Sequence, residues 1–264
     1  MELHLKDKVA VVTGASKGIG LAVVEAMARE GVRVVAGSRG STPELDALRD
    51  THDVTVVAVD LAAPEGAETL VRQAVERHQR LDILVNNVGA AAHRAGFLQV
   101  SDAEWQRILD LTFFSAVRAS RAALPHLVSA GEAAIVNISS INARLPFPMV
   151  VDYSAAKAAL TNLSKSLSEE FAPQGVRVNA ISPGPVRTPM WTAPGGFADA
   201  TAADAGITAQ EALDVAVPRN MGISSGRITE PHEIADLTLF LASPLAANIT
   251  GADIIVDGGQ VKTL

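Results

Sequence analysis

The residues best suited to chemistry are a tyrosine and a lysine four positions apart. Tyr153 is the only tyrosine among the 264 residues, and Lys157 is one of 6 lysines. If residues were placed by composition alone, a lysine would follow that tyrosine at this distance only about 2% of the time. Positions i and i+4 share one face of a helix, and a nearby ammonium group favours the charged form of a phenol. The spacing therefore favours a proton-transferring pair over a buried tyrosine beside a solvated lysine.

A glycine-rich turn near the start of the chain could bind phosphate. The sequence T-G-A-S-K-G-I-G at 13–20 lies between an apolar, β-branched run and a segment with helical spacing. Glycine permits a tight turn and lets a pyrophosphate approach the free N–H groups at the start of a helix. An ordinary strand-to-helix turn has the same look, but we predict dinucleotide contacts from Gly14, Ser16, Lys17, Gly18, Ile19 and Gly20.

The residues at the end of the second strand help to decide which dinucleotide is bound. Dinucleotide sites keep an acid there for the adenosine ribose, and this chain has Ser38 followed by Arg39. An arginine binds a 2′-phosphate through charge-assisted hydrogen bonds, and Lys17 would add a second cation. We therefore infer NADP(H) over NAD(H), the alternative being that both cations are merely solvated.

Polar residues also follow the third and fourth strands. Asp60, next to Leu61, could accept a hydrogen bond from the adenine amino group or could cap a helix. N-N-V-G at 86–89 ends the fourth strand at the edge where ligands of doubly wound folds bind. We predict cofactor contacts from Asn86 and Gly89, with a purely structural role open for both asparagines and favoured more for Asn87.

Strands and helices are expected to alternate along the chain. The predicted strands are 8–13, 33–37, 54–59, 83–85, 133–138, 176–181 and 253–256, and the predicted helices are 19–30, 43–50, 66–78, one from 101 toward Pro125, and one carrying Tyr153 that ends near Pro173. Alternation of this kind predicts right-handed βαβ units around a parallel sheet. Segment 183–231 is expected to be irregular around one short helix at 209–217. With no linker or change of composition, we predict a single domain.

Composition excludes several classes of function. The net charge of -7 and the absence of a basic run argue against nucleic acid and anionic membranes as partners. Without cysteine there is no disulfide, thiolate nucleophile or cysteine-based metal site, and we predict no metal centre. No signal peptide and no apolar run of about 18 residues is present. We expect a cytoplasmic protein acting on a small molecule.

Several motifs together produce a family resemblance. They are the turn at 13–20, N-N-x-G at 86–89, Ser140 thirteen positions before Tyr153, Y-x-x-x-K, and P-G with Thr188 four positions after the glycine. Over nearly its whole length the chain resembles the short-chain dehydrogenases/reductases, and within them the 3-oxoacyl carrier-protein and ketone reductases. The resemblance implies a Rossmann-like, doubly wound, seven-stranded parallel sheet flanked by helices. It also implies a nicotinamide dinucleotide and a homo-oligomer, a tetramer or a dimer.

The resemblance also assigns roles to the residues of the reactive centre. Tyr153 would be the general acid in reduction and the base in oxidation, and Ser140, rather than the competing Ser139, would donate to the carbonyl oxygen. Lys157 would favour the phenolate and hold the nicotinamide ribose. The family has an asparagine in a proton relay seven positions after a tryptophan, and counting from Trp105 gives Thr112. We expect a slower or differently hydrated relay.

The segment after the sixth strand would hold the nicotinamide and the substrate. By resemblance Pro183, Gly184, Val186 and Thr188 meet the carboxamide, and 187–229 is a variable substrate loop. Met190 and Trp191 would cover the substrate, or they would pack or contact another subunit. The predicted pocket wall, Asn142, Leu145 and 147–151, is mostly apolar, which favours a hydrophobic or ring-bearing ketone.

Three functions fit the sequence. The first is an NADP(H)-dependent enzyme that interconverts a carbonyl and a secondary alcohol. The second is an NAD-dependent alcohol or hydroxysteroid dehydrogenase, for which an acid at position 38 would have been expected. The third is a non-catalytic dinucleotide sensor, and the only feature that favours it is Thr112 in place of the expected asparagine.

Overall fold

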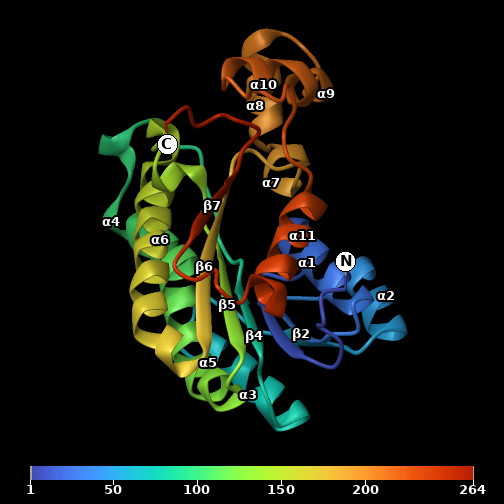
Figure 1. Ribbon diagram of the computed structural model, residues 1–264. Helices are drawn as coiled ribbons and strands as arrows, with labels where there is room; N and C mark the ends of the chain where they lie inside the picture. Colours follow the sequence, from blue (N-terminus) through green and yellow to red (C-terminus); the bar gives the residue numbers. More distant parts are fainter. Residues whose placement is uncertain (1, 264) are drawn as a thin grey trace.

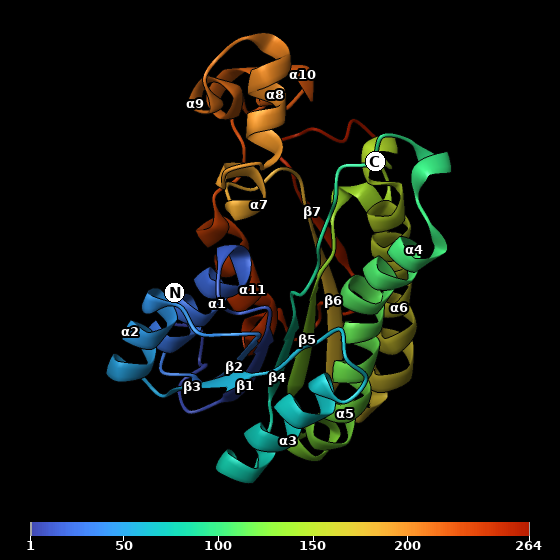
Figure 2. The ribbon, with the colours of Figure 1, turned by 180° about the vertical axis from the view of Figure 1, so that it is seen from behind.

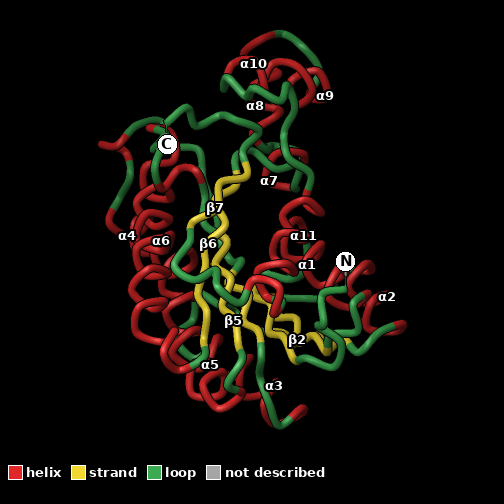
Figure 3. The backbone as a smooth tube through the Cα atoms, viewed as in Figure 1, coloured by secondary structure: helices red, strands yellow, loops and turns green. Residues whose placement is uncertain are grey.

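Seven parallel strands form one sheet at the centre of the molecule (Figure 3). The structure is a computed structural model that describes residues 2–263. The strand order is β3-β2-β1-β4-β5-β6-β7. The strands are β1 Val9–Thr13, β2 Arg33–Ser38, β3 Val54–Ala58, β4 Ile83–Asn86, β5 Ala133–Ile138, β6 Val176–Pro183 and β7 Asp253–Val256. The order reverses between β1 and β4, so a ligand crevice is expected at the carboxyl ends of these strands.

Helices cover both faces of the sheet, as Figures 1 and 2 show from opposite sides. On one face α1 Gly18–Arg29, α2 Pro43–Thr51 and α11 Pro231–Ala242 share a core with the sheet. On the other face α3 Gly66–His78, α5 Ser115–Ala130 and α6 Val151–Phe171 share a second core. The inner strands β1, β4 and β5 are buried on both faces, which is why they read as continuous apolar runs, whereas the edge strands β3 and β7 are partly exposed. The doubly wound, single-domain Rossmann-like prediction is confirmed.

The helix that begins after Ser101 is longer than predicted and contains a widened turn. Ser101 and Glu104 form the expected capping box at the start of α4 Asp102–Leu109. A π-helical turn, Asp110–Phe114, leads into α5, which passes through Pro125 and ends at Gly131 with φ +79°. The prediction that the helix ends near Pro125 is wrong, because the exposed Pro125 is tolerated and glycine in a left-handed conformation supplies the stop.

Segment 187–229 contains more helices than the single one predicted. The helix predicted at 209–217 is present, with a capping box formed by Thr208 and Glu211, and the prediction that the rest of the segment is irregular is wrong. It contains α7 Pro189–Thr192, α8 Phe197–Ala205, α9 Ala209–Glu211, a π turn Ala212–Ala216 and α10 Val217–Asn220. These helices form a cap beyond the carboxyl end of the sheet (Figure 1). The cap has its own core, made of Ala198, Leu213, Val217, Ile223 and Ile228 with Trp191 against it. Helices this short are not stable alone, so packing rather than local pattern decides their formation.

The longest helix carries the reactive pair. α6 spans 21 residues and places Tyr153 and Lys157 in its first two turns. Among residues 2–263, no helix is both long and apolar enough to cross a membrane. The start of α6 lies near the carboxyl edge of the sheet, so it presents the pair to the crevice (Figure 2).

Candidate active site

A cavity of about 540 Å³ opens at the carboxyl ends of the strands. Most of the residues predicted for the site line it. They are Gly14, Ser16, Lys17, Gly18, Ile19, Ser38, Arg39, Asp60, Leu61, Gly89, Ser140, Tyr153, Lys157, Pro183, Gly184, Val186 and Thr188. Of the residues predicted for catalysis or cofactor binding, Gly20, Asn86 and Thr112 lie outside this lining.

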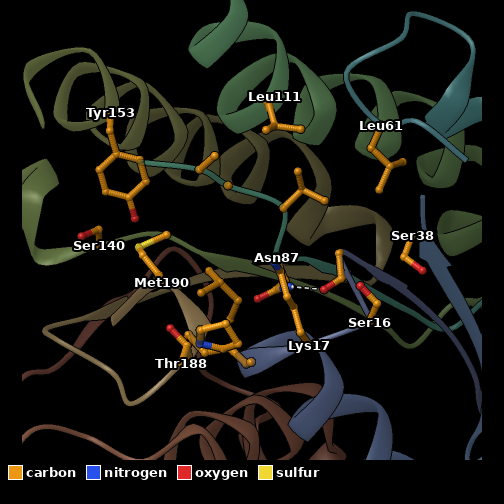
Figure 4. A pocket seen from close by; sticks show the side chains of 18 of the residues that line it. Ser16, Lys17, Ser38, Leu61, Asn87, Leu111, Ser140, Tyr153, Thr188 and Met190 are labelled. Atoms are coloured by element: carbon orange, nitrogen blue, oxygen red, sulfur yellow. Dashed lines mark hydrogen bonds between the residues drawn. The ribbon is translucent and has the colours of Figure 1, made fainter. Parts of the chain in front are cut away.

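Tyr153 and Ser140 face each other across one end of the cavity (Figure 4). Burial raises the pKa of Tyr153 to about 12, and a hydrogen bond with Ser140 opposes that rise. Ser140 Oγ accepts a hydrogen bond from the backbone N–H of Asn142 at 3.2 Å. With one lone pair engaged in this way, the Ser140 hydroxyl can still donate its proton to a ligand oxygen.

Lys157 lies beneath Tyr153 in an apolar setting. Its Nζ is 5.6 Å from the centre of the Tyr153 ring and donates to the carbonyl oxygen of Ile138 at 2.6 Å. Only 2% of the residue is exposed, and burial lowers the pKa of Lys157 to about 7. A Cβ on Gly89 would stand 3.2 Å from Nζ, so a glycine at this position keeps the ammonium group uncrowded.

Thr112, where the relay asparagine was expected, is fully buried in the π turn. Its Oγ1 accepts a weak hydrogen bond from the N–H of Ala90 at 3.4 Å. Its methyl carbon lies 3.8 Å from where a Cβ on Gly89 would be, on the same side as Lys157. Thr112 therefore supports the loop after β4 next to Lys157, one layer outside the cavity.

The glycine turn is shaped to receive a phosphate group. Lys17 is the N-cap of α1 but makes no side-chain hydrogen bond there, so the first N–H groups of the helix remain available to a ligand. Gly18 has φ +57° and lines the cavity. Gly20 does not reach the cavity: a Cβ there would stand 2.2 Å from the carbonyl oxygen of Gly14, so this glycine lets α1 pack on the turn. The open helix terminus and the glycine backbone fit the pyrophosphate of a dinucleotide.

The two asparagines at the end of β4 have different surroundings from those predicted. Asn86 is 3% exposed and its Nδ2 donates to Ser120 Oγ at 3.1 Å and to Asn137 Oδ1 at 2.8 Å, beneath the cavity. Asn87 lines the cavity, and its Nδ2 donates to the carbonyl oxygens of Thr13 and Gly14. The assignment of Asn86 to the cofactor is corrected, because neighbouring strand residues point to opposite faces and only Asn87 faces the turn.

The opposite end of the cavity carries the two cations. Lys17 and Arg39 are exposed, and neither forms an ion pair with any residue between 2 and 263. Ser38 is buried and donates its hydroxyl proton to the carbonyl oxygen of Gly40 at 2.8 Å. Asp60 lines the cavity, and its Oδ1 accepts from the N–H of Ala62 at 3.0 Å. This end is therefore positively charged at its mouth.

The substrate side differs from the predicted pocket wall. Asn142, Leu145 and residues 147–151 lie outside the cavity lining, and Leu145 is 46% exposed. Met190 and Trp191 of α7 do line the cavity, and Figure 4 shows the Met190 side chain between Tyr153 and Thr188. The cap therefore supplies an apolar wall that was predicted for the segment before α6.

Two lining residues had no signal in the sequence. Arg107 of α4 and Leu111 of the π turn reach the cavity beside Ala90. They belong to no motif, and only the packing of α4 against α6 brings them to the site. A helical-wheel projection from Thr112 could not have found them, because the π turn changes the phase of the helix.

Known proteins resemble this chain over its whole length. The profile of the family described as enoyl-(acyl carrier protein) reductase matches residues 14–260. A cis-4-hydroxycyclohexanecarboxylate dehydrogenase of Sinomonas cyclohexanicum is 34% identical over 256 residues, 96% of each chain. The crystal structure of L-sorbose reductase from Gluconobacter frateurii, complexed with NADPH and L-sorbose, has TM-score 0.92 and 34% identity, with 100% of both chains covered. Carveol dehydrogenase from Mycobacterium avium, in complex with NAD, has TM-score 0.89 and 27% identity, with 97% and 98% covered.

The geometry and these relatives agree. A glycine turn at a switch point and a Ser–Tyr–Lys centre at the carboxyl edge occur on a fold shared with dehydrogenases and reductases. The chain belongs to the short-chain dehydrogenase/reductase family and is an oxidoreductase that acts on CH–OH and keto groups.

Proposed function

We propose that this enzyme is an NADP(H)-dependent ketone reductase whose substrate is apolar or carries a ring. The observation that carries the proposal is the position of Tyr153 and Ser140 in a cavity that is also lined by Lys17 and Arg39, neither of which has an ion-pair partner among residues 2–263. A dinucleotide is long enough to connect these two pairs of residues. A non-catalytic sensor would not need a buried Lys157 beside the only tyrosine.

The chain's own residues would handle the proton and the carbonyl oxygen. The bound nicotinamide supplies or accepts the hydride. The Ser140 hydroxyl donates to the carbonyl oxygen, and the Tyr153 phenol gives its proton to that oxygen as negative charge develops. Burial raises the pKa of Tyr153, which hinders proton exchange at neutral pH. The positive charge on Lys157 is needed to lower the pKa of Tyr153 toward neutral pH.

The preference for NADP(H) rests on the residues at the end of β2. Ser38 carries no charge that would repel a 2′-phosphate, and Arg39 is exposed without an acidic partner among the described residues. The L-sorbose reductase of similar structure was crystallised with NADPH, whereas the carveol dehydrogenase was crystallised with NAD. Because the two relatives differ in cofactor, our preference for NADP(H) rests on the charge of Arg39 and the lack of charge on Ser38.

The substrate class rests on the cap. Met190 and Trp191 offer an apolar wall next to Tyr153, which suits a ring. The names of two relatives, cis-4-hydroxycyclohexanecarboxylate dehydrogenase and carveol dehydrogenase, also refer to cyclic alcohols. A sugar ketone is the second candidate, because the structure with TM-score 0.92 is a sorbose reductase.

A steady-state assay with a panel of substrates tests the proposal. The purified protein would be given NADPH or NADH with cyclohexanones, bicyclic ketones, β-ketoesters and ketohexoses. We expect turnover with cyclic ketones and a preference for NADPH in kcat/KM. Preference for NADH would contradict the role of Arg39, and selective turnover of ketohexoses would favour the second candidate. Absence of turnover with every class would revive the sensor hypothesis.

We also infer that the enzyme works in the cytoplasm as a homo-oligomer. Phe97 and Leu98, before α4, are 64% and 89% exposed, which suits burial by a second copy. Sedimentation of the purified chain would test the oligomer.

A further inference from the structure

A buried ion pair lies directly beside the reactive tyrosine. Asp152 precedes Tyr153 in the first turn of α6 and is completely buried. Its Oδ2 accepts two hydrogen bonds from Arg94, from Nε at 3.0 Å and from Nη2 at 2.5 Å. Its Oδ1 accepts from the backbone N–H of Tyr153 at 2.9 Å. The carboxylate is thus held by a fork on one side and holds the tyrosine backbone on the other.

The same arginine connects two further parts of the chain. Nη1 of Arg94 donates to Glu104 Oε1 at 2.6 Å, and the other oxygen of Glu104 accepts from the N–H and the hydroxyl of Ser101 in the capping box. The backbone N–H of Arg94 donates to the carbonyl oxygen of Met149 at 2.8 Å, just before α6. One guanidinium group, 12% exposed, therefore joins the loop after β4, the start of α4 and the start of α6.

The start of α6 needs such support. Its N-cap, Val150, has no side chain that could accept a hydrogen bond, and the helix follows a short 3-10 turn at Pro148–Val150. An uncapped first turn frays, and a shift of the backbone at Tyr153 would carry the phenol away from Ser140. Misplacement of a reacting group by about 1 Å can cost about 100-fold in rate.

We propose that Arg94 and Asp152 are positioning residues for Tyr153, acting as a buried fork that fixes the first turn of α6 in register with Ser140. This inference rests on the proposed reductase function. Neither side chain lines the cavity, so neither touches substrate or cofactor. The pair acts only through the backbone to which Tyr153 is attached.

The chain provides a matched control pair at the opposite end of the sheet. Asp82, before β4, is 1% exposed and is forked by Arg80 through Nε at 2.9 Å and Nη2 at 2.5 Å. Its Oδ2 also accepts a backbone N–H, that of Val9 at 2.8 Å. Both aspartates are buried, forked by an arginine and bonded to a backbone N–H, although Arg80 is 48% exposed where Arg94 is 12% exposed. Only the first pair adjoins the cavity.

The test uses the single variant Asp152→Asn and the double variant Arg94→Gln/Asp152→Asn, in which both charges of the pair are removed. The controls are Asp82→Asn and the double variant Arg80→Gln/Asp82→Asn. Each protein is assayed for Tm, for NADPH affinity by fluorescence, and for kcat with the best ketone of the panel. Asp152→Asn leaves the nearly buried Arg94 with Glu104 as its remaining counter-charge and should lower Tm, and the double variant should recover much of that loss. Asp82→Asn should lower Tm less, because Arg80 is 48% exposed.

We expect Asp152→Asn and its double variant to lower kcat about 10- to 100-fold. The dissociation constant for NADPH should change less than about twofold, because the glycine turn and Arg39 lie at the other end of the cavity. The Asp82 and Arg80 variants should keep the wild-type kcat whatever their Tm. If kcat at Asp152 recovers together with Tm in the double variant, or if Asp82→Asn loses as much kcat, the pair is merely structural and the proposal is wrong. An inactive wild-type enzyme would instead contradict the proposed function.

Discussion

The ammonium nitrogen of Lys157 lies 5.6 Å from the centre of the Tyr153 ring and donates to a backbone carbonyl, not to a carboxylate. Burial lowers the pKa of Lys157 to about 7, and it raises the pKa of Tyr153 to about 12 against the opposing hydrogen bond with Ser140. Both shifts oppose proton transfer at neutral pH. A ligand that adds negative charge and hydroxyl groups near Lys157 would reverse the first shift.

Binding of NADPH should therefore be coupled to proton uptake. Above pH about 7 the buried Lys157 is mostly neutral in the free enzyme, and anionic cofactor raises its pKa, so a proton is taken up near pH 8. Calorimetric titration in buffers of different ionisation enthalpy measures directly the number of protons taken up for each NADPH bound. At pH 8 the 2′-phosphate, which titrates near pH ~6, contributes nothing. Uptake that persists in Lys157→Met would show that another group takes up the proton.

Arg39→Gln should weaken NADPH selectively. Loss of one charge-assisted contact to the 2′-phosphate should lower kcat/KM for NADPH about 10- to 100-fold and leave NADH nearly unchanged. The exposed Arg49 of α2, outside the cavity lining, gives a matched control in Arg49→Gln. Equal losses for both cofactors would mean that Arg39 contributes to stability or general charge and not to phosphate recognition.

Thr112→Asn tests whether the buried threonine limits a proton relay. An amide offers two donors where the hydroxyl offers one, and the π turn places residue 112 next to the Lys157 side of Gly89. We expect a higher kcat and a smaller solvent deuterium isotope effect. Thr112→Ser, which keeps the hydroxyl, serves as the control. An unchanged kcat with an unchanged pH profile would remove Thr112 from any relay.

Met190→Ala should affect the ketone and not the cofactor. Removing the thioether wall beside Tyr153 loses about 1–2 kcal/mol of apolar contact, which corresponds to an increase of about 5- to 30-fold in KM for a ring-bearing ketone. The NADPH affinity should stay the same. Met221, which packs on the cap core, provides a control in Met221→Ala. A similar KM for both variants and wild type would exclude Met190 from the substrate wall.

Local motifs predicted the parts of the site that lie close together in sequence. Gly14 and Gly18 of the glycine turn, Tyr153 and Lys157 all line one cavity, together with Ser140, which the family resemblance had implied. Strand β5 has the predicted bounds because a buried parallel strand is a short, unbroken apolar run. Such features depend on the periodicity of a single helix or strand, which can be read from the sequence without knowledge of the tertiary structure.

Contacts between distant segments were decided by the tertiary structure. Asn86 and Asn87 are neighbours in sequence, but the register of β4 against β5 directs Asn86 to Asn137 beneath the cavity. Arg94 and Asp152 are 58 positions apart and meet only because α6 starts beside the loop after β4.

The amino-acid sequence by itself thus determined the fold class and the order of its elements, because both follow from short-range periodicity, and the family resemblance supplied the residues proposed for the reactive centre. The tertiary structure alone decided the cap helices before residue 209, the Met190 wall and the fork beside Tyr153. The cap helices are too short to form without the core they share, and a buried ion pair exists only where two backbones already lie side by side.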